Sequence, residues 1–291
     1  MKEIIFDEFI KFIVLVLKFL SIFGLSFLML LVSSVIYYQS INFKLQNELG
    51  VILGDSQTEA ALNDDTLSSY INLASSGTSL LYSYLKIKKI KECNPQIKTL
   101  ILGIGSRSFE KEKESIWVLN EDIIEARCEL IPFETYDELK EYNFSFGFIN
   151  SLMNLPFRAV LRSLSSKPKL EIFGGYKPLK HNNLLLETTR EHQIFGRNLD
   201  TSKFELKYLR KIKRFCFKNR IELIVVKLPN YQPYHYYYRP ELDIILDREL
   251  DSLRIIDYSK LELDSSYYSD IIHMNLKGSY LLSSKLAADL N

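Results

Sequence analysis

The sequence predicts an α/β fold with a parallel sheet, preceded by one N-terminal transmembrane helix. Two observations support this prediction. Short apolar runs alternate with segments whose apolar residues recur at helical spacing, and such alternation is typical of a parallel sheet with helices on both faces. In addition, no charged residue occurs from Phe19 to Phe43, and about 20 apolar residues suffice for a helix to cross the hydrocarbon core of a bilayer.

We interpret residues 1–43 as a cytoplasmic stub followed by a membrane anchor. The alternative is a cleaved signal peptide, whose apolar region usually has about 7–15 residues and ends at small residues. The run here is longer and ends in Tyr37 and Tyr38, which suit a membrane interface. Because lysines precede the span, the N-terminus is expected in the cytoplasm. Residues 44–291 are then expected outside it, in the periplasm or at the cell surface.

The soluble part is expected to form one domain of alternating strands and helices. The expected strands lie within residues 50–55, 67–74, 97–105, 221–229 and 252–259. The expected helices lie within residues 79–93, 202–220 and 275–290. The first of these helices has its lysines on the face opposite the apolar residues. Residues 107–200 do not fit the alternation, and we interpret this aromatic-rich segment as an insertion or lid between two strands.

Composition argues against several classes of function. The net charge is +1 and no basic stripe is present, so nucleic-acid binding is not expected. The three cysteines (Cys93, Cys128 and Cys216) have no CxxC spacing, which argues against a disulfide framework and against a zinc cluster. One pair plus one free thiol remains open. No metal and no cofactor are expected.

Ser56 is the first candidate for chemistry because it stands where a strand ends and a helix begins, in "VILGDSQTEAALN". A serine there can cap the helix by accepting a backbone N–H bond, and the position alone favours this reading. The same position exposes the side chain to backbone N–H donors that can stabilise an oxyanion. A nucleophilic serine, however, needs a histidine base and a carboxylate that orients the base.

One of the four histidines meets this requirement. His273 lies between a loop and the last expected helix, and Asp270 precedes it by three residues. In a turn, an aspartate at that spacing can reach the imidazole and leave its other nitrogen for Ser56. The remaining histidines are interpreted as exposed or packed structural residues: His181, His192 and His235.

At these residues the sequence resembles the SGNH/GDSL hydrolase superfamily, over essentially the whole soluble part. "LGDSQT" places Ser56 in the position of the nucleophile, and "NLASSGTS" places Gly77 in the position of an oxyanion-hole N–H donor. "SDIIHMNLKG" supplies Asp270 and His273. The resemblance implies a three-layer α/β/α sandwich with a parallel sheet and a Ser–His–Asp triad.

One family block departs from the pattern. The third block normally places an asparagine after a strand, whereas here "TLILGIG" is followed by Ser106, Arg107 and Ser108. Ser106 or Arg107 could substitute as the oxyanion donor, or the hole could rest on the backbone N–H groups of Ser56 and Gly77. Arg107 could also hold an anionic acceptor, or be a surface charge.

The departure and the anchor together resemble membrane-anchored SGNH-like proteins that modify the cell envelope. This resemblance implies a serine-dependent acyl ester hydrolase or O-acyltransferase that acts on a cell-envelope polysaccharide. The implied partners are an acylated glycan or acyl donor and a membrane-bound O-acyltransferase. The alternative is a catalytically silent SGNH-like scaffold that binds glycan or such an acyltransferase. The missing asparagine favours the scaffold, and the presence of all three triad residues weighs against it.

Overall fold

The computed structural model describes residues 2–46, 48–105, 107–111, 120–140, 145–165, 169–180, 200–231 and 240–290. The elements in chain order are α1 (Lys2–Gln39), β1 (Gly50–Leu53), α2 (Ser56–Ala61), β2 (Tyr70–Asn72), α3 (Leu80–Cys93), β3 (Thr99–Ile104), α4 (Glu121–Ala126), η2 (Cys128–Phe133), α5 (Tyr136–Leu139), α6 (Phe146–Leu164), η4 (Lys169–Phe173), α8 (Lys203–Lys218), β4 (Glu222–Lys227), α9 (Pro240–Glu249), β5 (Arg254–Asp257), η6 (Ser265–Tyr267) and α10 (Leu276–Leu290).

The strands form one five-stranded sheet in the order β2-β1-β3-β4-β5. Every neighbouring pair is parallel; Leu100 of β3, for example, lies opposite Val51 of β1 and Leu223 of β4. The central strands consist mainly of Val, Ile and Leu because both of their faces are buried. Each strand lies within a segment for which a strand was expected, so the predicted parallel sheet is confirmed.

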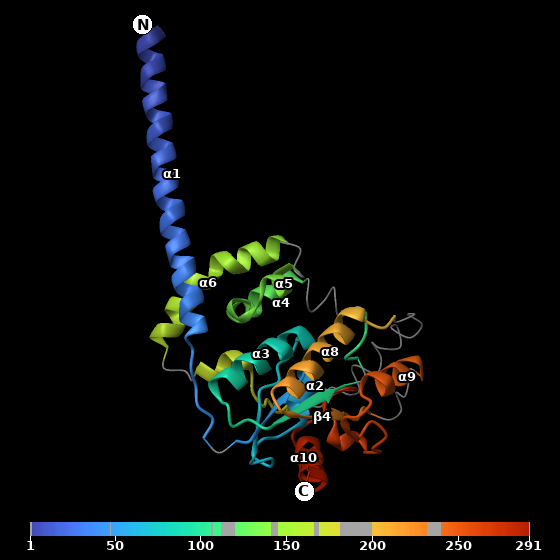
Figure 1. Ribbon diagram of the computed structural model, residues 1–291. Coiled ribbons are helices and arrows are strands. Elements are labelled where there is room, and N and C mark those ends of the chain that lie inside the picture. Colours follow the sequence, from blue (N-terminus) through green and yellow to red (C-terminus); the bar gives the residue numbers. More distant parts are fainter. Residues whose placement is uncertain are drawn as a thin grey trace.

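Helices cover both faces of the sheet, which gives three layers (Figure 1). Successive side chains of a strand point to opposite faces. On β3, Leu100 and Leu102 belong to the hydrophobic cluster that includes α3 and α8, whereas Ile101 belongs to the cluster that includes α2 and α10. The α/β/α arrangement implied by the resemblance is therefore confirmed. One detail of α3 differs from the expectation: Lys86 and Lys89 are buried rather than on a solvent-facing side.

The strand order determines where a ligand can bind. The chain goes from β1 to β2 on one side and then to β3 on the other, so the direction of winding changes between β1 and β3. In open parallel sheets, ligands bind outside the carboxyl ends of the strands at such a switch point. The segment that follows β1 begins at Gly54, close in sequence to Ser56, and the segment that follows β3 begins at Gly105, where a Cβ would lie 1.2 Å from Gln57 Oε1.

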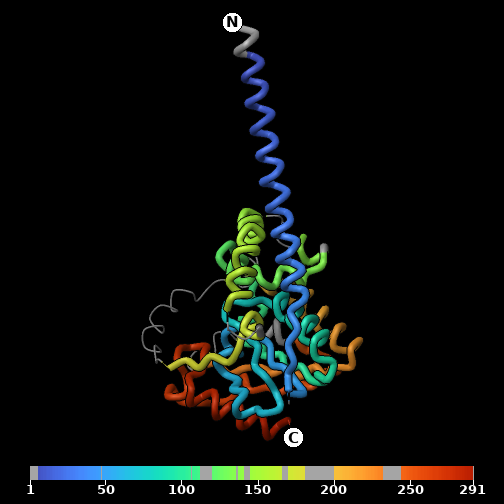
Figure 2. Tube along the Cα trace, turned by 90° about the vertical axis from the view of Figure 1, so that its left-hand side faces the viewer, coloured from blue at the N-terminus to red at the C-terminus, as the bar shows by residue number. Residues whose placement is uncertain are grey.

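Helix α1 extends far from the domain (Figures 1 and 2). It contains a segment, Phe6–Gln39, that is long and apolar enough to cross a membrane. Its last turns pack on the domain, where Tyr38 is 0% exposed and its hydroxyl donates a 2.8 Å hydrogen bond to Glu129. The insertion provides Tyr38 with both an apolar contact and a hydrogen-bond acceptor, and the expectation that this residue lies at the level of a membrane interface stays a prediction.

Residues 107–200 lie between β3 and α8, and their described part is mostly helical. Helix α6 lies beside α1 in both views (Figures 1 and 2). The segment after η4 returns to the sheet, where the N–H of Gly175 donates to Ala74 O at 3.1 Å. Gly174 has a φ of +106°, and a Cβ there would lie 2.2 Å from Ala74 O. The contact therefore requires glycine.

The three cysteines are all free thiols, and two of them (Cys128 and Cys216) are buried. The pairing that the sequence left open is absent from this structure. Burial raises the pKa of the Cys128 thiol to about 11, and that of Cys216 to about 12. Both side chains therefore act as small hydrophobic groups of the core.

The close packing of α2 on the sheet yields a first prediction. A Cβ on Gly103 would lie 2.2 Å from Oγ1 of Thr58, a residue of α2 that is 0% exposed. Because overpacking a core forces the backbone to shift, Gly103→Ala should lower the free energy of unfolding by about 1–3 kcal/mol. Urea denaturation of the full chain in detergent micelles measures this change.

The matched control combines Gly103→Ala with Thr58→Ala. Removal of the Thr58 hydroxyl and methyl groups leaves room for part of the new methyl group. The double variant should therefore lose less stability than the sum of the losses in the two single variants. Strictly additive losses would contradict the proposed steric conflict.

Candidate active site

Ser56 is the first residue of α2, but the cap of this helix is Asp55. Asp55 Oδ1 accepts a 3.1 Å hydrogen bond from the backbone N–H of Gln57. Its other oxygen lies 3.4 Å from the hydroxyl of Ser108, which in turn accepts from the N–H of Gly105. The cap interpretation of Ser56 is therefore wrong, because Asp55 has that role. The Ser56 hydroxyl remains available for another partner.

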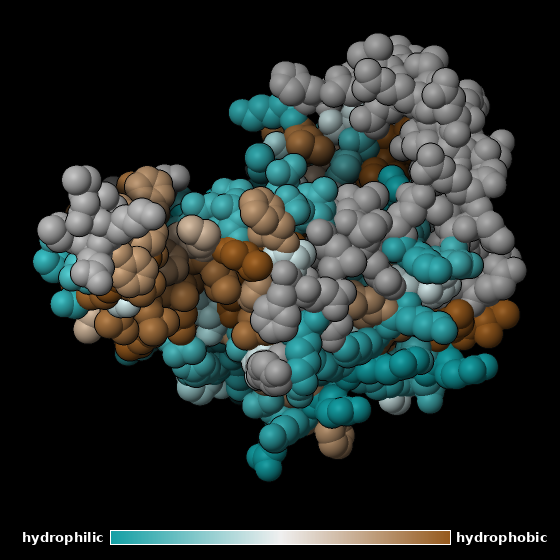
Figure 3. Space-filling view, turned by 90° about the horizontal axis from the view of Figure 1, so that it is seen from above, coloured by the Kyte–Doolittle hydropathy of each residue, from teal (hydrophilic) through white to brown (hydrophobic). Residues whose placement is uncertain are grey.

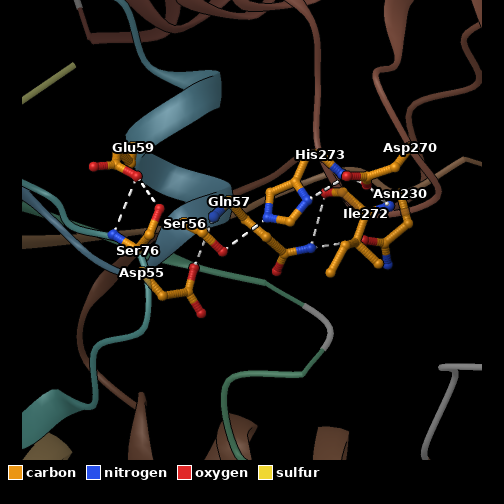
Figure 4. Close-up of polar contacts among 9 residues, drawn as sticks. All are labelled: Asp55, Ser56, Gln57, Glu59, Ser76, Asn230, Asp270, Ile272 and His273. Carbon is orange, nitrogen blue, oxygen red and sulfur yellow. Dashed lines mark hydrogen bonds and ion pairs between the residues drawn. The ribbon is translucent and has the colours of Figure 1, made fainter. Parts of the chain in front are cut away.

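That partner is His273 (Figure 4). The Ser56 Oγ lies 2.8 Å from His273 Nε2, and His273 Nδ1 lies 2.7 Å from Asp270 Oδ2. The second carboxylate oxygen of Asp270 accepts the backbone N–H groups of His273 at 2.7 Å and of Ile272 at 2.9 Å. One carboxylate thus holds both the imidazole ring of His273 and the backbone of the loop that carries it. The structure brings together the three residues that the sequence selected.

The charge state of Asp270 sets the direction of these hydrogen bonds. Burial raises the pKa of this carboxyl. The hydrogen bonds from the ring and backbone of His273, the electrostatic attraction of its ring, and the hydrogen bond from the N–H of Ile272 together outweigh burial, so the pKa lies below its usual value. An ionised carboxylate only accepts hydrogen bonds, so Nδ1 of His273 carries a proton. In the neutral imidazole, Nε2 then accepts from the Ser56 hydroxyl, which is the orientation required of a general base.

Gln57 connects α2 to the loop that carries His273 (Figure 4). It is 3% exposed, and its Nε2 donates to Ile272 O at 2.9 Å and to Asn230 Oδ1 at 3.3 Å. Asn230 follows β4, and its carbonyl accepts from the hydroxyl of Tyr268. Neither Gln57 nor Asn230 was predicted from the sequence as part of the site. The only signal for Gln57 was its position next to Ser56, and an isolated asparagine after a strand gave none.

The loop after β2, which contains Gly77, is held against the start of α2. The N–H of Ser75 donates to Gly54 O at 3.2 Å. The N–H of Ser76 donates to Glu59 Oε2 at 3.1 Å, and its hydroxyl donates to the same oxygen. Gly77 has a left-handed φ of +61°, which favours glycine. The loop therefore lies beside Ser56, and the role of Gly77 as an oxyanion donor stays a prediction.

Two basic side chains contact this loop. Nζ of Lys86, a residue that is 1% exposed, donates to Leu73 O at 3.0 Å and to the Ser75 hydroxyl. Arg127, which ends α4, donates to Ser76 O. Burial lowers the pKa of Lys86 well below its usual value, the charge of Arg127 lowers it further, and Glu59 opposes both. The loop is therefore tied to α2, to α3 and to the insertion.

The candidates from the third block are placed differently. Ser106 lies outside the described residues, as do His181, His192 and His235. Arg107 Nε donates to Glu110 Oε2 at 2.8 Å, and Glu110 is 1% exposed. Its guanidinium thus neutralises a buried carboxylate, and a role in holding an anionic acceptor stays a prediction. Within the described residues, no group of three His, Cys, Asp or Glu side chains could hold a metal ion.

No protein-family model and no curated protein matches the chain significantly. Among solved structures, the chain is similar to one described as "a putative platelet activating factor from Streptococcus pneumonia". The two are 11% identical with a TM-score of 0.40, over 94% of this chain and 98% of the other. A likeness at this level identifies neither a family nor an activity.

The ionised Asp270 should make stability depend on pH. Because its pKa is lower in the folded chain, its contribution is fully present above the unfolded pKa of about 4 and is lost as the pH falls through the folded value. The stability difference between the native chain and Asp270→Asn should therefore be largest at neutral pH and shrink in acid. Urea denaturation at pH 7 and pH 3 measures this difference. The control is Asp122→Asn, a change on the surface; a difference for Asp270→Asn that does not vary with pH would contradict the prediction.

Proposed function

We propose that the chain is a serine-dependent acyl ester hydrolase or O-acyltransferase of the SGNH type, with Ser56 as nucleophile, His273 as base and Asp270 as its orienting carboxylate. The observation that supports this most directly is the hydrogen-bonded series from Ser56 to His273 and Asp270, at 2.8 and 2.7 Å. Both distances lie within the reach that proton transfer requires. The series also lies at the switch point of the sheet, where ligands bind in folds of this type.

In the proposed reaction, His273 Nε2 takes the proton of Ser56 as Oγ attacks the ester carbonyl carbon. The backbone N–H groups of Ser56 and Gly77 stabilise the oxyanion of the tetrahedral intermediate. The C–O bond of the ester then breaks, and the leaving alkoxide receives the proton from His273. Asp270 holds the imidazole in the required tautomer and stabilises the imidazolium. Attack by water on the acyl-enzyme gives hydrolysis, and attack by a sugar hydroxyl gives transfer.

We further propose that α1 anchors the domain outside the cytoplasm, where it acts on an acylated cell-envelope polysaccharide beside a membrane-bound O-acyltransferase. The length and apolarity of Phe6–Gln39 support an anchor. The lysines before the charge-free stretch support a cytoplasmic N-terminus. The proposed substrate rests on the sequence resemblance to envelope-modifying SGNH-like proteins.

Labelling with a fluorophosphonate serine probe tests the proposed nucleophile. The full chain in detergent micelles should be labelled, and Ser56→Ala should abolish the labelling. His273→Gln should slow it by about 10²–10⁴-fold, the usual contribution of a general base. Ser69→Ala, which changes an exposed serine, serves as the control. If the folded chain shows no labelling that depends on Ser56, the enzyme proposal fails and the silent scaffold remains.

A second measurement distinguishes hydrolysis from transfer. Acetylated envelope polysaccharide is incubated with the full chain, with and without a de-acetylated acceptor polymer, and free and polymer-bound acetate are measured. Release of free acetate without an acceptor supports a hydrolase. Movement of acetate only when the acceptor is present supports a transferase. Ser56→Ala should abolish both.

A further inference from the structure

Helix α6 exposes an unusual row of large apolar side chains. Seven of them are between 47% and 79% exposed: Phe146, Ile149, Met153, Phe157, Val160, Leu161 and Leu164. At about 100° per residue, these positions fall within an arc of roughly 120° on one side of the helix. We call this arc the α6 apolar face. Outside α1, the described residues include thirteen exposed large hydrophobic side chains, and seven of them lie on this face.

The rest of α6 explains why the exposed side is apolar. Its opposite side is buried in the domain, where Phe148 and Leu155 are 3% and 0% exposed. The two arginines of the helix turn toward the domain, with Arg158 lying 3.8 Å from Glu125 and Arg162 lying 3.0 Å from Glu129. The helix thus directs its charged groups inward and its apolar groups outward, which is the reverse of a helix that faces water.

The α6 apolar face lies where α1 meets the domain. Leu31 and Val35 of α1 pack against the core, and Tyr38 is buried in it. A span of about 20 residues that starts at the first residue of the charge-free stretch, Phe19, reaches Tyr38. The part of the domain that packs on Leu31–Tyr38 therefore lies at the bilayer boundary. Viewed from the N-terminal end of α1, apolar side chains gather on the side of the molecule that holds α1 and α6 (Figure 3).

We propose that α6 lies in the membrane interface with its apolar face against the lipid acyl chains, alongside the anchor α1. This inference rests on the anchor part of the proposed function. Lipid is the occupant because the face continues the apolar surface of α1 and its charged groups turn toward the domain. In-plane helices of this kind bury one apolar side at the boundary between headgroups and acyl chains. The membrane contact of α6 then holds the domain in one orientation, so that the domain does not rotate freely about α1.

Tryptophan fluorescence tests this proposal. The chain has one tryptophan, so Trp117→Phe provides a dark background for single reporters in the full chain. Phe157→Trp places the reporter on the α6 apolar face. Phe217→Trp is the matched control, because Phe217 is an 87% exposed aromatic residue on α8. Phe23→Trp, at a 63% exposed position of α1, reports on the anchor. Each variant is reconstituted into phosphatidylcholine–phosphatidylglycerol vesicles with or without brominated phosphatidylcholine.

We expect brominated lipid to quench Phe157→Trp and Phe23→Trp at least about threefold more strongly than Phe217→Trp, with blue-shifted emission for the first two. Quenching of Phe23→Trp without quenching of Phe157→Trp would overturn the α6 proposal and leave the anchor intact. A blue shift of Phe157→Trp without quenching would also overturn it, since a second copy or another protein would then cover the face. Absence of quenching in Phe23→Trp would overturn the anchor and α6 together. Labelling of Ser56 in the same variants reports separately on the catalytic proposal.

Discussion

The hydrogen bond between Ser56 and His273 constrains the whole domain, because it joins two residues that are 217 positions apart. Their elements, α2 and the loop before α10, must therefore lie on the same face of the sheet. The contact between α2 and α10 achieves this: the Ser283 hydroxyl of α10 accepts from the N–H of Asn63 at 2.7 Å and donates to Ala61 O. The hydrophobic cluster that includes α2 and α10 thus fixes the distance between Ser56 Oγ and His273 Nε2, over which a proton would move.

A division of roles among consecutive residues frees the serine for this bond. Asp55 accepts the N–H of Gln57 at the start of α2, Ser56 points to His273, and Gln57 donates to the carbonyl of Ile272, the residue before His273. A serine that capped its own helix would direct its hydroxyl toward the backbone. The three side chains therefore have three different roles in one turn: Asp55 caps the helix, Ser56 is the candidate nucleophile, and Gln57 helps to position the candidate base.

The sequence was sufficient for the five strands, for α3, α8 and α10, and for the three candidate catalytic residues, but not for the helices of the insertion or for the contacts that position the candidate site. The strands were predictable because each is a short apolar run between turn residues, and Asp270 and His273 because they are close in sequence. Gln57 and Asn230 carried no such pattern, since their hydrogen bond depends on the order of β1, β3 and β4. Lys86 was predicted to face solvent, and this was wrong because helical spacing does not reveal that the carbonyl of Leu73 lies beside its Nζ. Long-range polar contacts of this kind follow from the packed fold.

The helical insertion links the proposed membrane contact to the active site. Helix α4 packs on α6, and Arg127 at its end bonds to Ser76 O. A Cβ on Gly77 would lie 3.2 Å from Ile123 of the same helix. The loop proposed to stabilise the oxyanion therefore contacts α4, and α4 packs against α6. If lipid holds α6 in place, the membrane restrains this loop through two packed helices, α4 and α6. Under the proposed function, the membrane would then orient the candidate active site toward the surface on which the substrate is proposed to lie.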